Sequence, residues 1–238
     1  ILPGIVMGLM TSVHYMTNAF DAPIYLLLTS MLFLVRYRFS VRFFANVMAL
    51  IASMMVFSLP FTSNFEPFSS SIGINCAPDF LISMKSLGPL VFEAEKCQIS
   101  QWWMVMLLWG FFWFNFIFFG LKHIFRQGKS HATSVYIFVL FTVSTMLILI
   151  PEFAYAKDIY PAHFRANTMF KLGYQAFMMM GIGSAYVFSS MKSILSKKNP
   201  LVITYLILFL PLFFLVAIYP TFAIDSFYGH NKEGVSMN

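Results

Sequence analysis

Charge is scarce in this 238-residue chain: Asp, Glu, Lys and Arg together make up only 10% of the residues, against about a quarter in a typical soluble domain. Cysteine is also scarce, with two residues. No Cys/His cluster has zinc spacing, and no Gly-rich phosphate loop follows a strand. These absences argue against a free-standing soluble enzyme, a zinc module and a P-loop domain, and we assign no metal-binding residues.

Hydrophobic residues dominate instead, at 59% of the sequence with 30 Phe and 17 Met, and the mean hydropathy is +0.77. Such a chain is typical of a protein whose solvent is lipid. The net charge of +6 comes from basic residues scattered between apolar runs, so we expect no nucleic-acid partner. The chain starts at Ile1 inside an apolar stretch, and we expect it to work with the remainder of a longer chain.

Charge-free runs place the predicted membrane spans. A helix needs about 20 residues to cross the hydrocarbon core, and five runs without any charge come close to that length: 43–60, 101–121, 132–151, 172–191 and 201–220. Residues 1–35 carry only Asp21. We divide them into spans 1–16 and 22–35, because Pro23 suits a first helical turn and Asn18 or Asp21 suits an N-cap. The sequence therefore predicts an all-α, polytopic transmembrane helix bundle of about seven spans.

The charges that remain are segregated by sign. Nine of the fifteen basic residues lie in the connections 36–42, 122–131 and 192–198, and all nine acids lie in the other segments. The positive-inside rule assigns the three basic connections to the cytoplasm of a multi-pass protein of the cell membrane. Residues 61–100 then form an extracytoplasmic loop, in which we expect short helices. It holds Cys76 and Cys97, which either pair there or remain two free thiols.

The most informative outer segment runs from Pro151 to Lys171, PEFAYAKDIYPAHFRANTMFK. Charges at span ends are costly unless they are paired or hydrated. We take Glu152 and Asp158 as candidate catalytic acids that orient a hydroxyl or hold a metal. Arg165 and Lys171 are candidates for a phosphate clamp. The competing interpretation is ordinary interfacial snorkelling, with salt bridges that tie two helices together.

Spacing adds further candidates to this site. Asn167, Lys171 and Gln175 are four residues apart and share one face of the entering helix, so we add Asn167 and Gln175 as substrate-binding residues. Asp21 is either a plain N-cap or, together with Asn18, part of a broken-helix site. We expect Asp21, Glu152, Asp158, Arg165 and Lys171 to converge on one outer cavity, since each is predicted to lie at the same membrane level.

Two motifs carry a resemblance to a known family. The stretch Asn18-Ala19-Phe20-Asp21-Ala22-Pro23-Ile24-Tyr25 resembles the Asn-x-x-Asp-x-Pro-x-Tyr signature of the YYY-type archaeal and bacterial membrane proteins, a family of unassigned function. The series Glu152, Asp158 and Arg165-Ala166-Asn167-Thr168-Met169-Phe170-Lys171 resembles the same family's second motif. The family is similar in layout to the GT-C glycosyltransferases.

The resemblance implies an integral-membrane enzyme that takes a sugar from a polyprenyl-phosphate carrier at the outer face, with membrane lipid as its other partner. Arg165 and Lys171 would stabilise the departing phosphate. Asp21 and Glu152 would position the acceptor or a divalent metal ion. Two other classes stay open. One is a secondary transporter or lipid flippase, and the other is a non-catalytic membrane scaffold.

Overall fold

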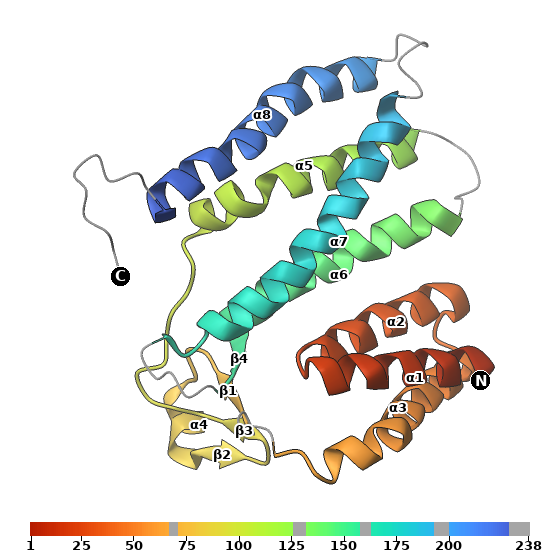
Figure 1. Cartoon of the computed structure of the whole chain (residues 1–238), viewed down its shortest axis with the longest axis vertical. Coiled ribbons are helices and arrows are strands. Elements are labelled where there is room, and N and C mark those ends of the chain that lie inside the picture. Colours follow the sequence, from red (N-terminus) through yellow and green to blue (C-terminus); the bar gives the residue numbers. More distant parts are fainter. Residues whose placement is uncertain (67–70, 126–131, 158–162, 193–199, 229–238) are drawn as a thin grey trace. The chain divides into compact units, whose positions relative to one another are not determined.

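The computed structural model describes residues 1–66, 71–125, 132–157, 163–192 and 200–228, and shows a mostly helical chain with one small sheet (Figure 1). The helices in the seven ranges predicted as spans are α1 (Leu2–Thr17), α2 (Asp21–Tyr37), α3 (Val41–Thr62), α5 (Trp102–Phe125), α6 (Ala132–Phe153), α7 (Ala166–Lys192) and α8 (Pro200–Tyr228). The all-α prediction is therefore confirmed for the membrane part.

Four helices of the described chain are long and apolar enough to cross a membrane: Val41–Thr62, Trp102–Ile124, Ala132–Phe153 and Pro200–Ser226. The helices α1 and α2 have only 16 and 17 residues, which gives each about 24–26 Å of length. The helix α7 has 27 residues but carries the polar stripe of Asn167, Lys171 and Gln175. A membrane protein with several spans is thus established, while the count of seven stays a prediction.

The chain divides into two compact units, and each is described by itself. The first unit comprises residues 1–101 and 129–183. In it α1 packs along α3 (Figure 1), and two glycines explain the close approach. A side chain at Gly4 would collide with the backbone of Asn46, and one at Gly8 with the backbone of Leu50. Asn46 also accepts a hydrogen bond from the Gly4 N–H at 3.2 Å, which satisfies one free donor of the α1 N-terminus.

The predicted loop 61–100 contains one short helix, α4 (Asp79–Met84), as expected, but strands were not predicted there. The strands β1 (Ile72–Ile74), β2 (Ser86–Leu87) and β3 (Leu90–Val91) join β4 (Ala154–Ala156), which follows α6 directly. The sheet order is β2-β3-β1-β4, with β1 parallel to β3 and antiparallel to β4. Strands of two or three residues give almost no periodic signal, which explains the omission.

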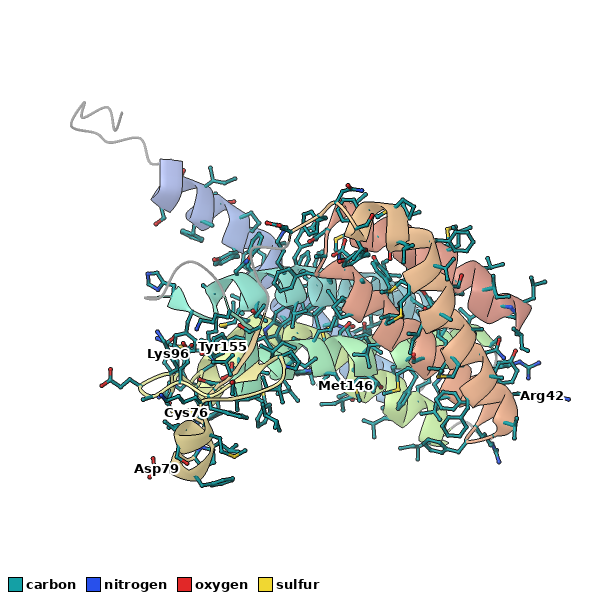
Figure 2. All side chains as sticks on the ribbon, turned by 90° about the horizontal axis from the view of Figure 1, so that it is seen from below. Arg42, Cys76, Asp79, Lys96, Met146 and Tyr155 are labelled. Carbon is teal, nitrogen blue, oxygen red and sulfur yellow. A yellow bond between two sulfur atoms is a disulfide. The ribbon has the colours of Figure 1, made fainter. Side chains whose placement is uncertain are left out.

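A disulfide joins Cys76 to Cys97 beside this sheet, so the pairing left open by the sequence is settled by the fold. Figure 2 shows Cys76, Asp79, Lys96 and Tyr155 at one end of the first unit and Arg42, from the basic connection 36–42, at the other. Disulfides persist in oxidising compartments. The sidedness of the chain stays a prediction. Most of the basic connections 122–131 and 192–198 lies outside the described residues.

The second unit comprises residues 102–128 and 184–238. Within it α5 and α8 pack on each other through aromatic rings, among them Phe114 stacked on Tyr205 and Phe111 against Phe209. The Tyr205 hydroxyl donates to Asn115 Oδ1 at 2.7 Å, and both residues are fully buried. The aromatic residues of α5 therefore contribute to its packing against α8.

Candidate functional site

The first turns of α7 organise the candidate site, because most of the predicted residues lie on it or contact it. Arg165 directly precedes the helix, and Asn167, Lys171 and Gln175 follow at four-residue intervals. The site lies entirely within the first unit. Asp158, predicted as a catalytic acid, lies outside the described residues.

Arg165 and Glu152 form a buried ion pair. The Arg165 Nη1 donates to Glu152 Oε2 at 2.9 Å, and the two side chains are only 7% and 16% exposed. The same nitrogen donates to the Pro151 carbonyl at 3.2 Å, and Nη2 donates to Ser100 Oγ at 2.8 Å. The Ser100 N–H in turn donates to Glu152 Oε2 at 2.8 Å. We call Ser100, Glu152 and Arg165 the ion-pair group.

The ion-pair group caps the C-terminal end of α6. Pro151 and Glu152 stand in the last turn of that helix, whose final carbonyls have no partner inside the helix. Arg165 satisfies one of them, and a cation there also favours the helix dipole. Asn75 donates to the Glu152 carbonyl and to the Gln98 carbonyl, both at 2.8 Å. The group therefore fastens the disulfide-linked segment to α6 and α7.

A second polar group surrounds Asp21. Its Oδ1 accepts from Asn18 Nδ2 at 3.0 Å and from Gln175 Nε2 at 3.2 Å. The Tyr25 hydroxyl donates to Gln175 Oε1 at 3.5 Å, and the His14 ring stacks on the Tyr25 ring with centroids 4.2 Å apart. All five residues are half-buried. We call Asn18, Asp21 and Gln175 the amide–carboxylate group.

The carboxylate of this group does not cap a helix, so the N-cap prediction was wrong. The N-cap residue of α2 is Phe20, and it makes no side-chain capping hydrogen bond. Asn18 Oδ1 accepts weakly from the Phe20 N–H, at 3.4 Å. The backbone of the turn between α1 and α2 thus leaves the Asp21 side chain available for contacts with other elements.

The two groups lie at different levels along α7. Gln175 is nine residues beyond the first residue of α7, Ala166, which corresponds to about 14 Å along the helix axis. Asp21 contacts α7 at this position through its hydrogen bond with Gln175. Among the described residues no hydrogen bond or ion pair links Asp21 to the ion-pair group. The described residues therefore form two separate polar groups beside α7, and their convergence on one cavity stays a prediction.

Lys171 stands between the two levels. It is half-buried, and neither its ammonium group nor the Asn167 side chain has a hydrogen-bond or ion-pair partner in the described part of the chain. Lys171 precedes Gln175 by one helical turn, about 6 Å, on the same face. It therefore presents a positive charge on the outer side of the amide–carboxylate group.

An apolar pocket of about 190 Å³ opens beside these residues. Its walls come from α2, α6, α7 and the strands β1 and β4, with Phe20, Ile24, Leu147, Ile150, Tyr155 and Leu172 among the lining residues. Thr168 also lines it, and its Oγ1 accepts from the Ala156 N–H at 3.0 Å. Asp21 and Lys171 are each next in sequence to a lining residue. The pocket itself is therefore apolar and suited to a hydrocarbon chain.

The sheet builds the outer wall of the pocket through Tyr155. Its ring fits because residue 73 is glycine, where any side chain would collide with it. The Tyr155 hydroxyl donates to Glu93 Oε2 at 3.1 Å, and Lys157 pairs with Glu93 Oε1 at 2.7 Å. Burial and the neighbouring Glu93 carboxylate raise the pKa of Tyr155 to about 12. The hydrogen bond from Lys157 lowers the pKa of Glu93.

Sequence reasoning missed several residues of the site. His14 was assigned no role, and Asn75, Ser100 and Tyr155 were not singled out. Tyr25 follows Asp21 by four residues, so helical spacing could have placed both on one face. The partners of Ser100 and Asn75 are 52 and 77 residues away. Local patterns carry no signal for such contacts.

Metal binding was left open for Asp21 and Glu152. These two acids belong to different groups, and the described residues contain no cluster of three or more His, Cys, Asp or Glu side chains that could hold a metal ion. Since Asp158 lies outside the described residues, a divalent ion at this site stays a prediction.

Comparison with known proteins gives one family. A model of the family described as uncharacterized membrane protein (DUF2298) matches residues 122–180, which contain α6, β4 and the first turns of α7 with Glu152, Arg165, Lys171 and Gln175. No curated protein and no solved structure matches the chain. Over this stretch the chain is similar to a membrane protein family of uncharacterised function, in agreement with its membrane-spanning helices.

Proposed function

We propose that this chain is the membrane part of a GT-C-like glycosyltransferase that uses a polyprenyl-phosphate-linked sugar at the outer membrane face. One observation carries the proposal: an apolar pocket is lined by Phe20 and Leu172, the sequence neighbours of Asp21 and Lys171, and both of these charged residues are half-buried. A lipid-linked phosphate needs these three features together, namely a space for hydrocarbon, a cation for phosphate and a polar group for the reacting end.

Lys171 supplies the cation in this proposal. Its charge stands in the second turn of α7 and is half-buried. The isoprenoid chain would enter the pocket next to Leu172. Asn167, one turn before Lys171, extends the phosphate contact. Charge stabilisation of the departing phosphate is the largest catalytic contribution expected of the site.

The acids take separate roles. Asp21 is proposed to orient a hydroxyl group of the bound substrate, because one of its carboxylate oxygens makes no hydrogen bond in the described structure. Glu152 acts from a distance by holding Arg165, whose guanidinium already contacts three protein groups. With so little exposed surface, Arg165 supports the site better as an anchor than as a direct phosphate ligand. Asp158 remains a proposed catalytic acid.

Polyprenyl phosphate binding to the full-length protein in lipid nanodiscs tests the proposal. Replacing Lys171 by Met should weaken binding about tenfold or more, since a charge-assisted hydrogen bond to phosphate is lost. Replacing it by Arg should preserve binding. Lys85→Met is the matched control, because Lys85 is exposed on the loop and its side chain has no partner among the described residues. Unchanged binding by Lys171→Met would refute the proposed phosphate site.

Two further outcomes decide between the alternatives. A folded Arg165→Lys variant is compared with Lys171→Met. If it loses as much affinity for polyprenyl phosphate, Arg165 binds the phosphate directly, since lysine cannot reproduce a bidentate contact. Transfer of the intact lipid between leaflets without release of its sugar would favour the flippase. The same nanodiscs serve for both measurements.

A further inference from the structure

We propose that Asn18, Asp21 and Gln175 bind a neutral polyol, a sugar ring with neighbouring hydroxyl groups. This inference rests on the proposed function and names the headgroup of its substrate. The three residues come from the turn before α2, the start of α2 and the third turn of α7. All three are half-buried, so they combine partial shielding from water with access for a ligand.

The hydrogen bonds within the group leave a defined set of free positions. Asn18 and Gln175 each use one N–H of the side-chain amide on Asp21 Oδ1, and each amide carries two. Two N–H donors therefore remain. Asp21 Oδ2 has no partner among the described residues. The group thus offers one free acceptor and two free donors.

This pattern fits hydroxyl groups and disfavours other ligands. A hydroxyl donates one hydrogen bond and accepts others, so two neighbouring hydroxyls could both donate to Asp21 Oδ2 while each accepts from one amide. A phosphate only accepts hydrogen bonds and would be repelled by the carboxylate. Lys171 stands one turn farther out on the same face and takes the phosphate in the proposed function. Anion and polyol sites would thus be about 6 Å apart along α7.

Two aromatic residues hold the polyol site in place. The Tyr25 hydroxyl donates to Gln175 Oε1, which turns the amide nitrogen of Gln175 towards Asp21. The His14 ring covers one face of Tyr25. Gln175 is therefore oriented by a fixed ring, and its free N–H keeps one direction, as specific recognition of a hydroxyl requires.

The test compares three probes on the full-length protein in nanodiscs: polyprenyl phosphate, polyprenyl-phosphate hexoses of the same chain length, and alkyl hexosides without phosphate. Glucose, galactose and mannose forms are included. At least one hexose form should bind more tightly than plain polyprenyl phosphate. Gln175→Met and Asp21→Asn should each lower the affinity for that form about tenfold. The affinity for plain polyprenyl phosphate should stay unchanged.

Gln98→Met is the matched control, because Gln98 is exposed and only its backbone is hydrogen-bonded. Thermal unfolding of each variant verifies that it is folded. If Gln175→Met does not fold, Gln175→Glu replaces it, because glutamate keeps the side-chain length but lacks both N–H donors. Equal affinity for all lipids, or an equal loss on lipids with and without a sugar, would overturn the polyol site. Alkyl hexosides that bind in a Gln175-dependent way while polyprenyl phosphate fails to bind would support the polyol site and refute the proposed function.

Discussion

The two polar groups on α7 differ in how completely the protein satisfies them. In the ion-pair group, the charges of Glu152 and Arg165 neutralise each other, both side chains are largely buried, and the contacts reach α6 and the disulfide-linked segment. In the amide–carboxylate group, Asp21 has no cationic partner within the described residues. It is half-buried, and part of its hydrogen-bonding capacity is free.

The difference separates a stabilising role from a binding role. A buried charge is tolerated when it is paired and hydrogen-bonded, and removing one partner then costs several kcal/mol. A half-buried carboxylate held only by amides contributes less to stability but leaves hydrogen-bonding positions for a ligand. Both groups contain residues of the motifs that suggested a site, so residue type alone could not have distinguished them.

The largest predicted effect comes from breaking the ion pair. Arg165→Met should lower the free energy of unfolding by about 3–5 kcal/mol, because it leaves the Glu152 carboxylate buried without a cation. Thermal and denaturant unfolding in detergent measure the loss. The double variant Arg165→Met with Glu152→Leu should recover part of it. A loss below about 1 kcal/mol, typical of exposed pairs, would contradict the anchoring role.

The second prediction concerns the disulfide beside the ion-pair group. It closes a loop between residues separated by 21 positions, for which the chain-entropy model gives about 3 kcal/mol. Cys76→Ser with Cys97→Ser should therefore destabilise the protein by about 2–4 kcal/mol and expose residues 72–100 to limited proteolysis. Binding at the amide–carboxylate group should change much less. Wild-type protein treated with reductant should reproduce the result, and unchanged proteolysis in both cases would contradict it.

A smaller effect is expected for the amide–carboxylate group. Asp21→Asn keeps the size of the side chain and a hydrogen-bond acceptor at Oδ1, so the free energy of unfolding should change by no more than about 1 kcal/mol. Comparison with Arg165→Met under identical conditions gives the contrast directly. If Asp21→Asn destabilised the protein as much as Arg165→Met, the proposed division between anchoring and binding would be lost.

The smallest effect concerns pH at the outer wall of the pocket. The hydrogen bond from the Lys157 ammonium holds the pKa of Glu93 below its usual value. The ionised carboxylate therefore stabilises the folded protein above the pKa of Glu93 in the unfolded chain, about 4.3. This stabilisation is lost as the pH falls through the lower pKa of the folded state. Since the pair is partly exposed, we expect about 0–1 kcal/mol. The free energies of unfolding of the wild type and of Glu93→Gln should become equal as the pH falls from 6 to about 3. If the difference between the two free energies stayed constant over this range, the ion pair would make no such contribution.

The extent of the helices followed from the sequence, because charge-free runs of helical length have few alternatives in lipid. Each of the seven predicted ranges holds a helix. The helix α7 extends beyond its charge-free range 172–191 to Ala166, as the four-residue spacing of Asn167, Lys171 and Gln175 indicated. The short strands β1, β2 and β3 were missed because two or three residues give almost no periodic signal, and β1 pairs with β4, about 80 residues away in the chain.

The sequence by itself determined that this is a helical membrane protein, how its charges are distributed, and which side chains are available for chemistry. These are local properties, set by hydropathy, charge and helical periodicity. Only the tertiary structure decided that Arg165 is paired with Glu152, that Asp21 meets Gln175 and not Arg165, and that Cys76 bonds to Cys97. Such contacts join residues 13 to 154 positions apart, and they depend on how the short α1–α2 hairpin, α6 and α7 are packed, which no local pattern encodes.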